Sequence, residues 1–168
     1  IRSYKGLDLL IQAFSDKRLR NRKLKLIIAG EFYEDDTPYR SLVKRYKIED
    51  DIIFFDHFIK DNEVSLFFSV SDLIVQPYKS ATQSGVTQIA YHFEKPMIVD
   101  DVGGLREIVP NGKCGYVVKP DPVEISDAIL DYFDNDKLAL FTEGVRQERK
   151  KFSWDKMTAA ILEVYDKC

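Results

Sequence analysis

Cysteine is scarce in this sequence: its 168 residues include only Cys114 and Cys168, which form no C-x-x-C spacing. Two cysteines so far apart are typical of reduced thiols and not of a disulfide framework or a zinc site. A chain of this length buries about 70% of its unfolded surface, so it needs neither a disulfide nor a structural metal for stability. We therefore expect a single domain over residues 1–168, in a cytoplasmic setting.

Long apolar runs and an excess of basic charge are also missing. No apolar run approaches the roughly 20 residues of a transmembrane helix, and no signal-peptide pattern is present. The net charge of −3 disfavours nucleic acid as a partner, since such surfaces are usually strongly basic. The basic cluster from Lys17 to Lys25 is typical of a solvated helix end. Membrane association through another part of the protein stays open.

Three strong catalytic signatures are absent as well. The sequence contains no G-x-x-x-x-G-K-[ST], no G-x-G-x-x-G and no G-x-S-x-G, which removes the strongest signals for a P-loop enzyme, a dinucleotide-binding enzyme and an α/β-hydrolase. His57 and His92 have no metal-ligand companions nearby in the sequence, so we expect both to be structural or exposed. No metal site is expected.

What the sequence does contain is an alternation of helical and strand-like apolar patterns. Helices are expected over Gly6–Leu19, Pro38–Tyr46, Asp61–Ser69 (with Asp61 as N-cap), Ser84–Phe93, Gly103–Val109 and Pro122–Phe133, and strands over Leu24–Ala29, Ile52–Phe55, Leu73–Val75, Pro96–Val99 and Gly115–Val118. Such alternation predicts an α/β fold with a doubly wound parallel sheet between two helical layers.

Two helices are expected to finish the chain. The last, Ser153–Tyr165, places Trp154, Met157, Ile161, Val164 and Tyr165 on one face. Core packing is the simpler interpretation of this face, and docking onto a further domain is the alternative.

Ligands of an open parallel sheet bind at the carboxyl ends of its strands, so the loops there are the places to search. The segment Arg2-Ser3-Tyr4-Lys5-Gly6 leads into the first helix. Two cations beside a glycine at a helix N-terminus are suited to hold a diphosphate, because the helix dipole and free N–H groups add to their charge. Plain surface charges at Arg2 and Lys5 are the alternative.

Two later loops are rich in small residues. In one, Gly85 allows an anion to approach the backbone, and Thr82 or Ser84 is suited to contact phosphate oxygens or to cap the helix. In the other, Gly103-Gly104 allows either a tight turn or a close approach to a ligand. An ordinary N-cap and a bare turn are the alternatives.

Several stretches match one known pattern when they are taken together in order. They are Tyr4–Phe14, Leu26–Gly30, Asp72–Tyr78, Lys95–Val99, Gly103–Val109, Gly115–Val118 and the closing Phe152-Ser153-Trp154. In this order the sequence resembles the C-terminal domain of GT-B fold glycosyltransferases, in particular the large retaining group commonly called family four. The resemblance implies the Rossmann-like half of a GT-B fold.

The resemblance also implies roles for individual residues. Lys5 would neutralise the diphosphate of a nucleoside-diphosphate sugar and stabilise the leaving group, with Arg2 as a helper, and the helix start at Ser84-Gly85 would offer backbone donors to the phosphates. Further donor contacts are expected in the same loops, at Thr82, Gln83, Gln88, Gly103, Gly104 and Glu107. The nucleotide sugar is the donor substrate, and no metal or separate cofactor is expected.

One departure concerns two glutamates that the family typically carries seven residues apart. Counting back from Lys95-Pro96, these positions fall on Ala81 and Ile89, whose side chains accept no hydrogen bond. Gln83 and Gln88 are near enough to take their place, because a neutral amide also holds hydroxyl groups. The loop then resembles a subgroup that uses Thr-Gln-Ser-Gly.

We therefore expect the donor-binding half of a glycosyltransferase that transfers a sugar to a glycan or lipid-linked acceptor, with retention, in polysaccharide or cell-envelope synthesis, in the cytoplasm or at the inner membrane face. The acceptor would bind to a separate N-terminal domain, and this chain alone would turn over little. A nucleotide-sugar epimerase-like domain and a non-catalytic binding module are the alternatives.

The beginning of the sequence carries one more expectation. It opens with Ile1 and enters a helical pattern almost at once, as is typical of an excised fragment. The strand that should precede the first helix would lie upstream of Ile1. The sheet is then expected to lack a central strand or to fill the gap with a neighbouring molecule.

Overall fold

The computed structural model describes residues 1–152, 158 and 162–165. Its strands are β1 (Leu26–Ala29), β2 (Ile52–Phe55), β3 (Ile74–Gln76), β4 (Met97–Asp100) and β5 (Gly115–Val118). Its helices are α1 (Leu7–Phe14), α2 (Lys17–Arg20), α3 (Thr37–Tyr46), α4 (Asp61–Val70), α5 (Gly85–His92), α6 (Leu105–Ile108), α7 (Pro122–Asp134) and α8 (Leu138–Arg149), with short 3-10 turns at Ser3–Lys5, Glu49–Asp51 and Lys150–Phe152. The expected alternation of strands and helices is confirmed, and β2 and β5 have the predicted bounds.

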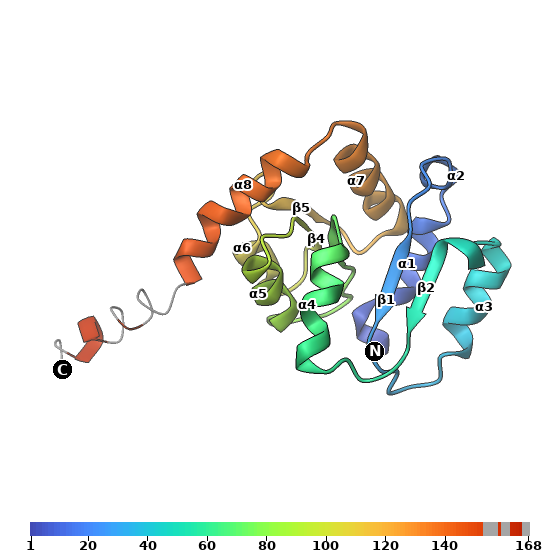
Figure 1. The fold of residues 1–168 in the computed structure, drawn as a ribbon, viewed down its shortest axis with the longest axis horizontal. Coiled ribbons are helices and arrows are strands. Elements are labelled where there is room, and N and C mark those ends of the chain that lie inside the picture. Colours follow the sequence, from blue (N-terminus) through green and yellow to red (C-terminus); the bar gives the residue numbers. More distant parts are fainter. Residues whose placement is uncertain (153–157, 159–161, 166–168) are drawn as a thin grey trace.

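The strands are all parallel and form two sheets, β1-β2 and β3-β4-β5 (Figure 1). In the first sheet Leu26 lies opposite Ile52, and in the second Ile74 lies opposite Met97, which lies opposite Gly115. No ladder joins β1 to β3 among the described residues. A break in the sheet is thus present as expected, and a missing central strand as its cause stays a prediction.

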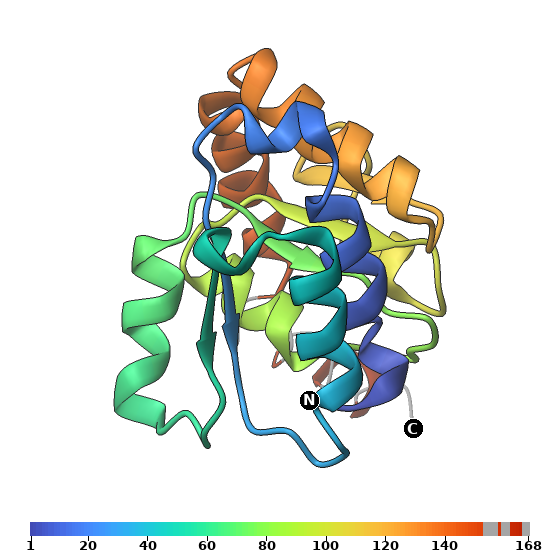
Figure 2. The same cartoon turned by 90° about the vertical axis from the view of Figure 1, so that its right-hand side faces the viewer.

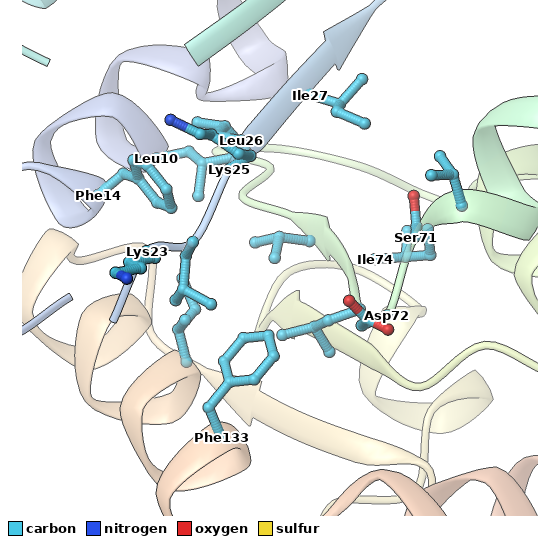
Figure 3. Close-up of a pocket in the computed structure, with 15 residues that line it drawn as sticks. Leu10, Phe14, Lys23, Lys25, Leu26, Ile27, Ser71, Asp72, Ile74 and Phe133 are labelled. Carbon is cyan, nitrogen blue, oxygen red and sulfur yellow. The ribbon is translucent and has the colours of Figure 1, made fainter. Parts of the chain in front are cut away.

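The gap between β1 and β3 is a slot lined mostly by apolar side chains, with Lys23, Lys25, Ser71 and Asp72 also at its wall. A pocket of about 450 Å³ lies there, and Figure 3 shows Leu26 and Ile27 on one side of it and Ile74 on the other, with Phe133 across its end. Both strands thus present an unpaired backbone edge to the slot.

The start of the chain enters at the carboxyl end of this slot. The amino group of Ile1 donates to the carbonyl oxygen of Glu31, and the N–H of Tyr33 donates to the carbonyl oxygen of Ile1 at 3.0 Å. Ile1 is therefore tied to the loop that follows β1.

Apolar side chains cover both faces of the sheets. Along β4, Ile98 packs into one core cluster, while Met97 and Val99 pack into another, because successive side chains of a strand point to opposite faces. The first cluster is formed with α1, α3 and α7, and α1 contacts both of the other two helices (Figure 2). The second cluster receives side chains from α4, α5, α6 and α8. The predicted three-layer arrangement is confirmed.

Several predicted bounds need correction. The helix expected over Gly6–Leu19 is two helices, because Asp16 interrupts it and its carboxylate accepts the N–H of Arg18 at 2.8 Å, which starts α2. The N-cap of α4 is Lys60 and not Asp61. The N–H of Lys60 is held by the carboxylate of Glu63 at 3.0 Å.

The interpretation of the last helix as core packing is wrong for the residues that the structure describes. Val164 and Tyr165 are 64% and 77% exposed. Trp154, Met157 and Ile161 lie outside the described residues, as does Cys168, whereas Cys114 is a buried free thiol. None of the described helices is long and apolar enough to cross a bilayer.

Gly6 connects the turn at Ser3–Lys5 to α1 and requires the absence of a side chain. Its φ is +65°, and a Cβ built there would lie 1.8 Å from the carbonyl oxygen of Pro77. We expect Gly6→Ala to lower the free energy of unfolding by about 2–4 kcal/mol, measured by urea denaturation.

The matched control is Gly85→Ala, because no atom of the described part of the chain lies within 4 Å of a Cβ built at Gly85. Its free energy of unfolding should change by no more than about 1 kcal/mol. Equal effects of the two substitutions would contradict the close approach at Gly6.

Candidate functional site

A pocket of about 440 Å³ opens at the carboxyl ends of β1 and β3. Its walls come from the start of the chain, from the segments that follow β1, β2 and β3, and from the first turn of α5. The residues that line it include Ile1, Lys5, Gly30, Glu31, Tyr33, Phe58, Ile59, Gln76, Tyr78 and Val86. It lies where ligands bind in open parallel sheets.

Lys5 supplies positive charge to this pocket. Its Nζ donates to the hydroxyl of Tyr78 at 2.8 Å and lies 4.3 Å from the centre of the Tyr78 ring. The ring of Tyr4 is 5.7 Å from the same nitrogen. Among the described residues no carboxylate forms a salt bridge with Lys5. The ammonium group therefore keeps donor capacity for an anion in the pocket.

The first turn of α5 lies beside the Lys5–Tyr78 pair. The hydroxyl of Tyr78 lies 3.3 Å from that of Ser84, the N-cap residue of α5, and Gly85 is the first residue of the helix. Lys5 and the start of α5 are thus joined through a single side chain. The juxtaposition that the two loops predicted is present in the structure.

Arg2 lies on the β1 side of the pocket. Its guanidinium group is 4.9 Å from the centre of the Tyr33 ring, a cation-π contact with a residue that lines the pocket. Arg2 itself is exposed. Its carbonyl oxygen accepts the N–H of Lys5 at 2.9 Å, but its guanidinium group lies over Tyr33 and not at the Lys5–Tyr78 pair, so its expected role as a helper stays a prediction.

The loops after β3 and β4 touch each other. A Cβ built at Gly103 would lie 1.6 Å from the carbonyl oxygen of Ala81, and the N–H of Gly104 donates to the carbonyl oxygen of Thr82 at 3.1 Å. Contact between loops thus accounts for both glycines. Their expected contact with a donor stays a prediction, as do those of the exposed residues Thr82, Gln83 and Glu107.

Gln88 and Ile89 lie elsewhere. Both line a hollow between α4 and α5, together with Asp61 and Val64, and neither lines the pocket that contains Lys5. Gln88 therefore does not bring an amide to Lys5 in this structure, and the position of the second family glutamate faces α4.

Two polar residues at the ends of the inner strands were not predicted as site residues. Gln76 ends β3 and Asp100 ends β4, and both are almost completely buried. The available signal was a polar residue at the end of an apolar strand, directly before a loop that carries candidate residues. Tyr33 and Phe58 were also missed, because exposed aromatic residues in loops carry no spacing signal.

Asp100 is a buried carboxyl group that no described residue pairs by a hydrogen bond. Its side chain is 0% exposed, and neither of its oxygens has a hydrogen-bond partner in the described part of the protein. Burial, with a smaller contribution from the charge of Glu124, raises the pKa of Asp100 to about 8. At neutral pH this carboxyl group is therefore mostly protonated.

No group of three or more His, Cys, Asp and Glu side chains within the described ranges is arranged to hold a metal ion. The cation that lines the pocket is Lys5, and Arg2 stacks on Tyr33 beside it.

An open parallel sheet with a cation and a helix N-terminus at its carboxyl rim has the architecture of a domain that binds a phosphate-bearing ligand. Residues 1–135 match the family described as Glycosyl transferases group 1, and the chain belongs to this family. The fold is the Rossmann-like half of a GT-B fold, as the sequence predicted.

Relatives and solved structures agree with this assignment. An uncharacterised glycosyltransferase of Methanocaldococcus jannaschii is 30% identical over 164 residues, which cover 96% of this chain and 44% of that protein. HepE of Anabaena in complex with UDP has a TM-score of 0.84 at 18% identity, over 99% of this chain and 46% of that one.

The C-terminal domain of the group 1 glycosyl transferase LpcC from Francisella tularensis has a TM-score of 0.79 at 20% identity. That match covers 90% of this chain and 80% of the LpcC domain. By contrast, the chain spans less than half the length of the curated relatives that it matches.

The buried carboxyl group of Asp100 predicts a pH dependence of stability. The folded state holds a proton on Asp100 up to about pH 8, whereas an unfolded aspartate loses it near pH 4, so the folded state binds more protons in between. The free energy of unfolding should therefore fall as pH rises from about 4 to 8. We expect Asp100→Asn to remove this contribution.

The measurement is urea denaturation of both proteins at a series of pH values. The difference between them isolates Asp100 from carboxylates with lowered pKa, such as Asp16 and Asp131, which act in the opposite direction. As pH rises, the free energy of unfolding of Asp100→Asn should increase relative to that of the wild type, by up to about 1.4 kcal/mol per pH unit. A constant difference from pH 4 to 8 would show that Asp100 is ionised in the folded state.

Proposed function

We propose that this chain is the donor-binding domain of a glycosyltransferase, which binds a nucleoside-diphosphate sugar in the pocket at the carboxyl ends of β1 and β3. The observation that carries the proposal is the joint placement of Lys5 and the first turn of α5, linked through Tyr78. A diphosphate is the part of the donor that needs both a cation and backbone N–H donors.

The role that we propose for Lys5 follows from where negative charge develops during sugar transfer. As the bond between sugar and diphosphate breaks, negative charge grows on the phosphate oxygens of the leaving group. The ammonium of Lys5 lies on the Tyr78 ring and has no carboxylate partner within the described structure, so it is suited to stabilise that charge. The dipole of α5 acts in the same direction.

The rest of the pocket is suited to the nucleoside. Tyr33 and Phe58 line it on the side of β1 and β2, and they are 60% and 64% exposed, so their rings are accessible to a planar base. The UDP complex of the structurally similar HepE supports a nucleotide as the ligand class. Titration with UDP, GDP and ADP identifies the base.

The wider function that we propose rests on family resemblance. The whole protein transfers the sugar, with retention, to a glycan or lipid-linked acceptor in polysaccharide or cell-envelope synthesis, in the cytoplasm and at the inner face of the membrane. The acceptor binds to a separate N-terminal domain, and the chain alone has little turnover. The chain covers less than half of its longer relatives, which supports a separate domain for the acceptor.

A non-catalytic nucleotide-binding module is the second candidate. It is favoured by Ala81 and Ile89, which stand at the family's glutamate positions, and by the placement of Ile89 against α4. An epimerase-like domain has less support, because neither His57 nor His92 lines the pocket that contains Lys5.

Calorimetric titration of the chain with UDP, GDP and ADP tests the proposal. We expect one of them to bind, and Lys5→Met to weaken that binding by about 10- to 100-fold, because a charge-assisted hydrogen bond contributes about 1.5–3 kcal/mol. Unfolding in urea should change little, since Lys5 forms no salt bridge with a described residue.

The matched control is Lys17→Met on α2, which precedes β1 and so lies at the opposite end of the sheet. It removes the same charge and should leave binding within about twofold. Absence of binding by all three nucleotides, or equal losses in the two lysine variants, would refute a diphosphate site at Lys5. Transfer activity of the whole protein then separates an enzyme from a binding module.

A further inference from the structure

Gln76 belongs to a buried chain of hydrogen bonds that ends at Lys5. Gln76 is 1% exposed, Thr87 0% and Ser84 8%, so three polar side chains lie between β3 and α5 among apolar neighbours. The Oε1 atom of Gln76 accepts the hydroxyls of Ser84 at 2.7 Å and of Thr87 at 3.1 Å. Such a cluster is costly to bury unless its groups are paired, so its arrangement is well defined.

The direction of the hydrogen bonds follows from the number of protons. Ser84 has one hydroxyl proton and gives it to Gln76, so the hydroxyl of Tyr78 is the donor in the 3.3 Å contact with Ser84. Tyr78 in turn accepts from the ammonium of Lys5 at 2.8 Å. The chain therefore runs in one direction, from Lys5 through Tyr78 and Ser84 to Gln76.

This arrangement prevents the side chain of Ser84 from capping α5. Serine is among the best N-cap residues, because its hydroxyl oxygen accepts an N–H of the first helical turn. Ser84 occupies the N-cap position of α5, yet its side chain makes no capping hydrogen bond. Gln76 holds that hydroxyl instead, which leaves the N–H groups of the first turn of α5 without a side-chain cap.

A second observation points to a ligand at this helix start. The Nε2 group of Gln76 is buried and has no hydrogen-bond partner among the described residues, while Gln76 is among the residues that line the rim pocket. A buried amide with a free donor costs about 1–3 kcal/mol.

We infer that Gln76 is a positioning residue for diphosphate binding, which acts through Ser84. By holding the Ser84 hydroxyl it keeps the N-terminus of α5 open for phosphate oxygens, and through Ser84 and Tyr78 it fixes the ammonium of Lys5. This inference rests on the proposed function, because it assigns the ligand's diphosphate to the same pocket.

The test is the affinity for UDP and for inorganic pyrophosphate, which has no base, in four proteins: wild type, Gln76→Leu, Ser84→Ala and the double variant. Gln76→Leu should weaken binding of both probes about tenfold, because the released Ser84 hydroxyl turns to cap α5. In the Ser84→Ala background, the same substitution should change affinity by less than about threefold. The midpoint of urea unfolding for Gln76→Leu should fall moderately, since the substitution removes one unpaired donor but also takes the acceptor from the buried hydroxyls of Ser84 and Thr87.

Thr87→Val is the matched control, since it removes the other hydrogen bond to Gln76 and leaves the link to Ser84 intact. It should keep wild-type affinity for pyrophosphate within about twofold. If Gln76→Leu fails to fold, Gln76→Met, which is closer in shape, serves the same comparison.

The outcomes distinguish this inference from the proposed function. If the wild type binds none of UDP, GDP, ADP and pyrophosphate, the proposed function and this inference both fail. If the wild type binds but Gln76→Leu does not weaken binding, only this inference fails. It also fails if the loss is the same with and without Ser84.

Discussion

The contact between the turn at Ser3–Gly6 and the segment that follows β3 determines the geometry of the whole rim. Gly6 lies against the carbonyl of Pro77 in a conformation that only glycine adopts easily, and the N–H of Lys79 donates to the carbonyl oxygen of Tyr4 at 2.8 Å. The hydrogen bond from Lys5 to Tyr78 depends on this contact. The first turn of α5 follows the same segment, so charge and helix dipole meet at one point.

The fold could be predicted from sequence because its signals are periodic and redundant. Apolar residues in the strands, and Pro and Gly at their ends, fix the order of elements even where each bound is uncertain by a residue or two. The break at Asp16 was not predicted, because the apolar stripe of α1 continues through Leu19, which is buried in the same cluster. Because Leu19 packs into the same core cluster as α1, the apolar pattern did not reveal that Asp16 caps a second helix.

The candidate site could be predicted only in part. Lys5 and Gly85 carry signals that general principles recognise, a cation beside a glycine and a glycine at a helix start. Gln76 and Asp100 do not, because a buried polar residue at the end of a strand gains its meaning from its partners in space. The pocket's aromatic residues Tyr33 and Phe58 are likewise brought together by two different loops.

The slot between β1 and β3 has a consequence for the pocket above it. Tyr33 and Phe58 follow strands of one sheet, while Lys5 and Tyr78 are tied to the other, and below the rim the two sheets are held together by side-chain packing instead of a shared ladder. Backbone hydrogen bonds fix a spacing sharply, whereas apolar packing tolerates small displacements. The distance between the base side and the phosphate side of the pocket is therefore set by how the slot is filled.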